Sequence, residues 1–328
     1  MKNKRSAGVP KQQKVYFTYE QQIAKLRSDG LIVENERRAM ARLKWEGYYN
    51  FAVGYNRLFK DAQKRYLPGV KFEHVEALFD FDKHLRGIVY EYAQQVECNL
   101  KALISDEFSK KYGVDERSYL AEENFVQTEA EKPLVRWIIG TCRTALKDAC
   151  REGSGSYRDY IAYYAKTYRH VPLWALIRAL SFGNTSKFLR LMKTDDSREV
   201  AREYGLGVQE LCNMTEVLVC FRNIAAHGER VYCARLPHVR LTQKLSVLQK
   251  LQIPKKADGT PLYGRSDFMA CLIVFKYLLP PNEFLECFER LKREVEKLEA
   301  CLPPFAYRRA LEEMGLSGSW KKLDKINV

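Results

Sequence analysis

The feature that most constrains the fold is a run of 40 residues, 72–111, in which apolar side chains recur every three or four positions. That spacing places them along one side of an α-helix, whereas a half-buried strand would alternate apolar and polar residues. The apolar positions are Val75, Leu78, Phe79, Phe81, Leu85, Ile88, Val89, Tyr92, Val96, Leu100 and Ile104. We predict one long helix, or a helix broken once, that ends at Gly113.

Shorter helical patterns fill most of the remaining chain. Thr18 and Gln21 form a capping box before a helix that stops at Gly30. Further helices are predicted over residues 34–46, 134–150, 157–168, 172–180, 185–192, 208–226, 267–279, 283–302 and 307–314. Residues 255–264 are predicted to be a loop, and 231–239 hold at most short β-like pieces. The sequence therefore predicts an all-α protein, and its 46 % hydrophobic residues suffice for a core.

Breaks and charge divide the chain into four predicted parts. Residues 1–17 form a flexible basic arm, and 18–70 a small N-terminal helical unit that ends at the break Pro68-Gly69. Residues 71–302 form a larger helical domain, and 303–328 a C-terminal helical extension. Inside the larger domain, the Gly-Ser segment 153–156 is predicted to be a linker.

The charge balance favours a polyanionic partner. The chain has 55 Lys and Arg against 41 Asp and Glu, a formal net charge of +14. Such a surplus favours nucleic acid or an anionic membrane surface, although a protein that is merely basic and soluble is the alternative. No apolar run approaches the roughly 18 residues of a membrane span. We therefore expect nucleic acid, and no membrane, as the partner.

Cysteine usage points to the cytoplasm. The nine Cys lack CxxC pairing, and several lie in apolar periodic stretches, as buried thiols do in a reducing compartment. A zinc site needs clustered ligands, and none of the five His is paired with a Cys at ligand spacing. We expect a cytoplasmic protein with no metal site and no cofactor.

The pattern Arg222-Asn223-x-x-x-His227 carries the most chemistry. Asn223 and His227 share a helix face, and Gly228 predicts that the helix stops directly after the His. An imidazole at that end of a helix dipole suits acid–base work or phosphate binding. RNA cleavage by 2′-hydroxyl attack needs a proton shuttle and a cation for the phosphorane, which His and Arg supply without a metal. A plain helix end with a surface Arg is the alternative.

A second basic cluster is interleaved with tyrosines. Residues 157–193 hold seven cations and a single acid, Asp159. The cations are Arg158, Lys166, Arg169, Arg178, Lys187, Arg190 and Lys193. Tyr157, Tyr160, Tyr164 and Tyr168 fall on one helix face. Cations beside aromatic rings suit phosphate contact and base stacking, while an ordinary tyrosine core with solvated cations is the alternative. All but Lys193 are candidate RNA-binding residues, together with Lys11, Lys14 and Arg230.

Two acids within residues 72–111 have alternative roles. Asp82 and Arg86 are four residues apart, which indicates an intrahelical salt bridge. Glu97 lies between Val96 and Cys98. It either orients the Arg or the His of the motif, or is a solvated helix residue.

Several separated blocks, in order along the chain, carry a family resemblance. They are Gln22, Leu26, Gly30-Leu31, Tyr48-Tyr49, Gly54-Tyr55, Phe59, Phe72-Glu73, Phe81-Asp82, Leu85-Arg86, Glu97, Val171-Pro172-Leu173-Trp174, Ser181-Phe182-Gly183-Asn184-Thr185-Ser186-Lys187, Arg222-Asn223, Ala226-His227 and Arg230. With these blocks the chain resembles the Abi family of bacterial abortive-infection proteins, its AbiD/AbiF-like group, and through it the HEPN superfamily. It departs from the pattern at Arg178, where an acid is common, and at Ala225, where Cys is common.

The resemblance implies that the domain over 71–302 is a HEPN-like helical bundle with an RNA-directed role in phage defence. HEPN nucleases build one composite site from two RxxxxH motifs, and no other His here has an Arg four to six residues before it. The resemblance thus implies a homodimeric, metal-independent ribonuclease. His227 would transfer protons, Arg222 would stabilise phosphate charge and Asn223 would position the substrate.

Two other functions stay open at this point. One is a non-catalytic protein that holds a structured noncoding RNA, and the other is a toxin–antitoxin component. Whether the chain is an enzyme is therefore open as well.

Overall fold

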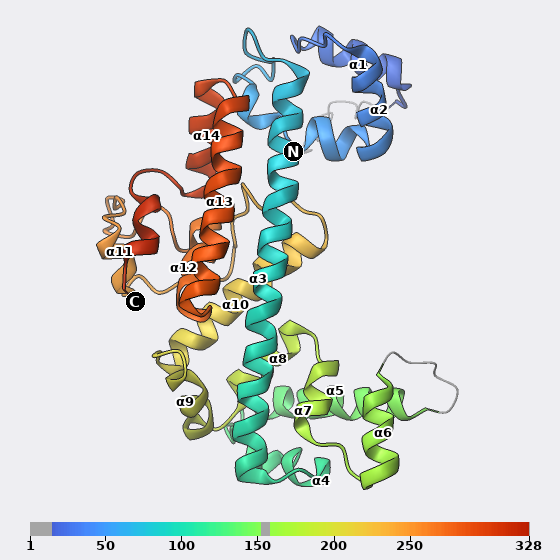
Figure 1. Cartoon of the computed structure of the whole chain (residues 1–328), viewed down its shortest axis with the longest axis vertical. Helices are drawn as coiled ribbons and strands as arrows, with labels where there is room; N and C mark the ends of the chain where they lie inside the picture. Colours follow the sequence, from blue (N-terminus) through green and yellow to red (C-terminus); the bar gives the residue numbers. More distant parts are fainter. Residues whose placement is uncertain (1–14, 152–157, 328) are drawn as a thin grey trace, which may run out of the picture. The chain divides into compact units, whose positions relative to one another are not determined.

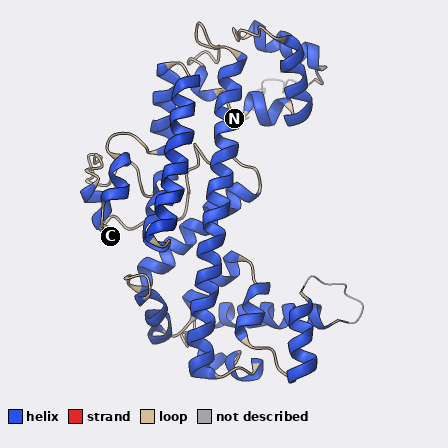
Figure 2. Cartoon of the chain, viewed as in Figure 1, coloured by secondary structure: helices blue, strands red, loops and turns tan. Residues whose placement is uncertain are grey.

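The computed structural model describes residues 15–151 and 158–327. It is 67 % helical, and the described residues form no β-strand, which confirms the predicted all-α class (Figure 2). Isolated bridges occur, for example between Phe125 and Met192. Residues 231–239, where β-like pieces were conceivable, form turns and bends.

The chain divides into two compact units. One unit is Met1–Phe79 with Cys301–Ala306, and the other is Asp80–Ala300 with Tyr307–Val328. The division falls inside helix α3 (Phe72–Tyr112), which runs unbroken for 41 residues (Figure 1). The prediction of one long helix ending at Gly113 is therefore confirmed in its unbroken form. The four-part organisation along the chain stays a prediction.

The smaller unit contains α1 (Tyr19–Ser28), α2 (Glu36–Glu46) and short turns over Tyr49–Val53 and Arg57–Phe59. The predicted capping box is present, since the Gln21 amide donates to Thr18 Oγ1 at 3.4 Å and the Thr18 amide donates to Gln21 Oε1 at 2.8 Å. The core of this unit is aromatic. Phe51 and Tyr55 pack on Phe79 with ring centroids 5.4 and 5.0 Å apart.

The larger unit holds most of α3 and the helices that follow it, apart from Cys301–Ala306, which belong to the smaller unit. Their bounds are α4 (Glu116–Tyr119), α5 (Lys132–Cys150), α6 (Asp159–Tyr168), α7 (Leu173–Leu176), α8 (Phe182–Leu191), α9 (Thr194–Arg202), α10 (Val208–Ala226), α11 (Ser246–Lys250), α12 (Phe268–Leu278), α13 (Pro281–Cys301) and α14 (Pro304–Met314). Helix α10 packs on α8 and α12, and α5 packs on α6 and α8. The Phe108 ring of α3 packs against Phe125 and Phe188, with ring centroids 5.5 and 5.0 Å apart.

Most predicted helices are present, with shifted ends. The helix expected over 185–192 begins at Phe182, because the Ser181 hydroxyl caps it by accepting from the Asn184 amide at 3.2 Å. The helix expected over 172–180 stops at Leu176 and continues as a 3₁₀ turn, Ile177–Ala179. The structure also contains α9, which the sequence analysis did not predict.

Helix α9 was missed because a polar contact, not an apolar stripe, anchors it. The Asp196 side chain of α9 is 1 % exposed, and it accepts hydrogen bonds from Lys111 and, at 2.7 Å, from the Tyr112 hydroxyl. Apolar periodicity cannot detect an anchor of this kind. In the part of the chain that the structure describes, no helix is long and apolar enough to cross a membrane.

Candidate functional site

The segment that carries the motif lies at the end of helix α10. His227 is the C-cap residue, with φ −87° and ψ 4°. Gly228 follows at φ +72°, a left-handed conformation that suits glycine and ends the helix. The Glu229 amide then donates back to the Ile224 carbonyl at 3.0 Å. The predicted helix end is confirmed, and the His227 side chain is exposed there.

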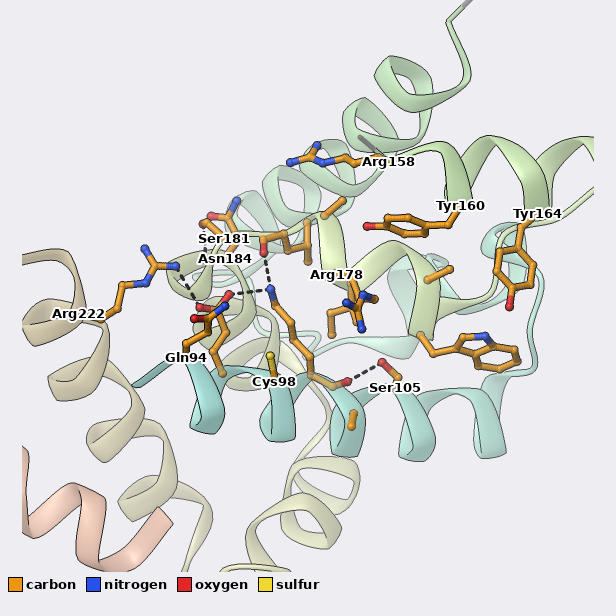
Figure 3. A pocket seen from close by; sticks show the side chains of 18 of the residues that line it. Gln94, Cys98, Ser105, Arg158, Tyr160, Tyr164, Arg178, Ser181, Asn184 and Arg222 are labelled. Carbon is orange, nitrogen blue, oxygen red and sulfur yellow. Dashed lines mark hydrogen bonds and ion pairs between the residues drawn. The ribbon is translucent and has the colours of Figure 1, made fainter. Parts of the chain in front are cut away.

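Arg222 is held by an acid from the long helix. Its Nη2 donates to Glu97 Oε2 at 3.0 Å, and its Nη1 donates to Asn223 Oδ1 at 3.1 Å. Glu97 is only 8 % exposed, and its Oε1 accepts from Lys101 Nζ at 2.7 Å. Lys101 also donates to the Leu180 carbonyl at 2.7 Å. Glu97 therefore orients Arg222, one of its two expected roles, and Figure 3 marks this contact of Arg222 with a dashed line.

Asp82 holds the chain on the other side of the motif. Its carboxylate is fully buried and accepts from the amides of Val231 and Tyr232 at 3.1 and 2.7 Å. The predicted salt bridge is also present, with Arg86 Nη1 at 2.7 Å. Helix α3 therefore fixes the segment twice, through Glu97 at Arg222 and through Asp82 just beyond His227.

Arg222 lines a large pocket of about 1250 Å³ in this unit. The pocket exceeds the roughly 300–1,000 Å³ of ordinary small-ligand clefts. Four of its described lining residues are cations, namely Lys101, Arg158, Arg178 and Arg222. Four are aromatic, namely Tyr90, Tyr160, Tyr164 and Trp174. Among the described lining residues Glu97 is the one acid, so the pocket favours anions.

The predicted RNA-binding cations fall into separate groups. Arg158 and Arg178 line the pocket together with Arg222. Lys187 instead sits over the Trp137 ring at 4.3 Å. Arg190 forms ion pairs with Glu131 and Glu216 at 3.6 and 4.0 Å.

The remaining predicted contacts lie elsewhere. Lys166, Arg169 and Arg230 are exposed and are not among the described residues that line the pocket. Lys11 and Lys14, like Tyr157, lie outside the described residues. An RNA that contacts all the described cations would therefore extend beyond the pocket.

The tyrosine face of α6 is not core. Ile161 is the one residue of this helix that is buried, while Tyr160 and Tyr164 line the pocket and Tyr168 is 51 % exposed. Figure 3 shows Tyr160 and Tyr164 projecting from α6 toward the hollow that contains Arg178. This geometry favours the ligand-facing alternative over the tyrosine core.

Of the three motif residues, only Arg222 is among the described residues that line the pocket, which also includes residues that the sequence did not single out. Asn223 and His227 are exposed and are not among the described residues that line the pocket. Lys101 was not predicted, although its spacing of four from Glu97 is a helical pairing signal. Trp174 was recognised only as part of a family block. Among the described residues, no three His, Cys, Asp or Glu side chains gather as a metal site requires.

Comparison with known proteins adds a family. The family model described as Abi-like protein matches residues 41–233, more than half of the chain. The chain belongs to the Abi-like protein family. No curated protein and no solved structure matches it. In this Abi-like protein, the matched range includes every described pocket-lining residue and the whole of the Arg222–His227 segment. Membership connects the chain with abortive infection, a bacterial defence against phage.

Proposed function

We propose that this Abi-like protein is a HEPN-type RNA-binding protein of phage defence that cleaves RNA without a metal when two copies meet. The observation that supports it most is the arrangement around α10. Arg222 is held by Glu97 at a pocket lined with cations, and His227 stands exposed at the end of the same helix. Arg222 is fixed by a contact within its own chain, and the exposed His227 is accessible to a second copy.

The proposed reaction is attack of an RNA 2′-hydroxyl on the adjacent phosphorus. The 2′-oxygen forms a bond to phosphorus while the bond to the 5′-oxygen breaks, which leaves a 2′,3′-cyclic phosphate and a 5′-hydroxyl. His227 of one copy takes the proton from the 2′-hydroxyl, and His227 of a second copy gives a proton to the leaving oxygen. Arg222 stabilises the charge that develops on the phosphorane.

A two-fold, isologous contact is the simplest way to supply two imidazoles. Each chain contains one such motif, so a single copy provides half of the proposed site. Asn223 accepts a hydrogen bond from Arg222 and stands beside His227 on the exposed end of the helix. It is proposed to position the RNA backbone there.

The test compares RNA cleavage by the wild type, His227→Ala and Arg222→Ala. His238→Ala is the matched control, because His238 is also exposed and is not among the described pocket residues. Loss of a proton-transferring His should lower the rate about 10²–10⁴-fold, and the control should retain it. Cleavage should survive EDTA and yield 2′,3′-cyclic ends. Cleavage that requires added magnesium would contradict the proposal.

Mixing chains tests the composite site. Equal amounts of wild type and His227→Ala, allowed to re-pair, leave about one quarter of the dimers with two His227 side chains, whereas independent sites would keep about half of the activity. A strictly monomeric chain that still cuts RNA would overturn the two-copy arrangement.

The competing function is RNA binding without cleavage. It is favoured by one observation, namely that His227 is not among the described residues that line the pocket containing Arg222. In that case His227→Ala should leave RNA affinity nearly intact, because one imidazole is a small part of an interface with many phosphate contacts. RNA that co-purifies with the protein but is never cut would establish this function.

A further inference from the structure

The pocket beside Arg222 has an aromatic wall that catalysis does not use. Trp174 is 45 % exposed at the start of α7, and Tyr90 of α3 is 45 % exposed. Tyr160 and Tyr164 add two half-buried rings from α6. Aromatic rings that stay open to solvent add little to a hydrophobic core, but they can stack on flat ligands such as nucleobases.

Three polar side chains that line the same pocket are available for hydrogen bonding. Within the described part of the chain, the Arg178 guanidinium has no ion pair, although it lines the pocket. The side-chain amides of Gln94 and Asn184 line it too, and neither has a hydrogen-bond partner among the described residues. Arg178 can therefore take a phosphate, while the two amides can read the edge of a base.

We infer that this pocket binds unpaired nucleotides of RNA, with bases against Trp174, Tyr160 and Tyr164 and a phosphate on Arg178. The inference rests on the proposed RNA-directed function and names the form of RNA that the site accepts. A duplex hides its base faces in the stack, so only unpaired bases can reach such rings. The volume of about 1250 Å³ leaves room for more than one small ligand.

The position of the pocket gives it a role in selecting substrate. Arg222 and Arg178 line the same hollow, so a strand seated on the rings runs toward the Arg222 side. Glu97 balances part of the charge of Arg222 and Lys101. Arg178 keeps its full charge for the strand. The pocket thus selects single-stranded segments and delivers them to the motif.

Cys98 provides a direct test, because it is exposed and lines the pocket. The full-length His227→Ala chain would be treated with iodoacetamide and its alkylation measured by mass spectrometry. Three additions would be compared, namely a single-stranded RNA of mixed sequence, its duplex, and free nucleoside monophosphates. Cys301 is exposed but is not a described pocket residue, so it serves as the internal reference.

The expected result is that single-stranded RNA slows the alkylation of Cys98, but not of Cys301, by fivefold or more at saturation. Stacking of one base on one ring changes affinity by about fivefold or more, so Trp174→Ala should raise the RNA concentration that gives half-maximal protection by at least that factor. Trp174→Phe should restore most of the affinity. Trp45→Ala, which removes a ring that is 84 % exposed and is not a described pocket residue, should change nothing.

Three outcomes overturn the inference. The first is equal protection by the duplex. The second is stronger protection by free nucleotides than by the strand at equal nucleotide concentration. The third is binding of RNA, seen by gel shift, without protection of Cys98. The last leaves the proposed nuclease untouched, whereas protection of Cys98 by a strand that the wild type never cuts would support the pocket and refute the nuclease.

Discussion

Asp82 and Glu97 are two acids on the same helix, and each helps to fix the segment that carries the motif, yet their surroundings differ. Asp82 is completely buried, and its contacts include two backbone amides and Arg86. Glu97 contacts two cationic side chains, Arg222 and Lys101, and lines a pocket. The first acid is part of the architecture, and the second holds groups that a ligand can reach.

This difference indicates how the site is organised. A carboxylate that satisfies backbone amides cannot move without unpairing them, so Asp82 fixes where the chain emerges after His227. The Glu97 carboxylate holds Arg222 and Lys101 in position, but an incoming phosphate can also bind these two cations. The Arg222 side of the motif is therefore preorganised by the chain, and its His227 side is left open.

The largest expected effect is on stability. Asp82→Ala leaves Arg86 and the amides of Val231 and Tyr232 without this partner, so the free energy of unfolding should fall by about 3–5 kcal/mol. The measurement is urea denaturation followed by circular dichroism.

The matched control is Asp106→Ala on the same helix. Asp106 and Lys110 are 3.9 Å apart, and their side chains are 78 % and 71 % exposed. Such a surface pair is worth about 0–1 kcal/mol. If Asp82→Ala and Asp106→Ala lower the free energy of unfolding equally, the buried Asp82 contributes no more to stability than the exposed Asp106.

The second expected effect is functional. Glu97→Gln removes the one acid among the described pocket residues, so RNA should bind several-fold more tightly. Arg222 would lose its charged partner at the same time, and the rate of cleavage of bound RNA should fall by about 10-fold or more. Single-turnover kinetics measure the affinity for RNA and the rate of cleavage of bound RNA separately.

Glu91→Gln serves as the control for Glu97→Gln. Glu91 also lies on α3 and pairs with an arginine, Arg290 at 2.8 Å, but it is not among the described pocket residues. Its replacement should leave both RNA affinity and the cleavage rate unchanged. Weaker binding with an unchanged rate in Glu97→Gln would mean that Glu97 is merely structural.

The sequence predicted much of the fold and one part of the site. Apolar spacing found α3 and α10, because each buries a long, regular stripe of side chains. Gly228 marked the end of α10 in the sequence, because glycine readily adopts the left-handed φ, here +72°, that ends a helix. The salt bridge of Asp82 with Arg86 was predictable because both partners belong to one helix.

The contacts that define the site could not be predicted in the same way. The hydrogen bonds that the amides of Val231 and Tyr232 donate to Asp82 join residues about 150 positions apart, and no local pattern reports them. The pairing of Glu97 with Arg222 depends on how α3 and α10 pack. The placement of Tyr160 and Tyr164 at the pocket likewise depends on which side of α6 is covered, and the spacing of the tyrosines fits either orientation.

The smallest expected effect concerns Asp196, a third acid that belongs with Asp82 rather than with Glu97. It is buried and accepts a hydrogen bond from the Tyr112 hydroxyl at 2.7 Å. Burial, together with this hydrogen bond, raises the pKa of Tyr112 to about 12. The unfolded chain has the ordinary tyrosine pKa of about 10. The contact therefore stabilises the fold fully below pH 10, and its contribution is lost as the pH rises through 12.

Tyr112→Phe should therefore lower the free energy of unfolding at neutral pH by about 0.5–1.5 kcal/mol. The difference between wild type and variant should shrink as the pH rises from 10 to 12, and urea denaturation across that range measures it. Subtracting the two curves is essential, because burial also raises the pKa of Tyr119 and Tyr204, which titrate in both proteins. If the difference in the free energy of unfolding stays constant up to pH 12, the Tyr112 hydroxyl does not lose its contact with Asp196 in that range. Asp82 would then be the one acid of this pair shown to stabilise the fold.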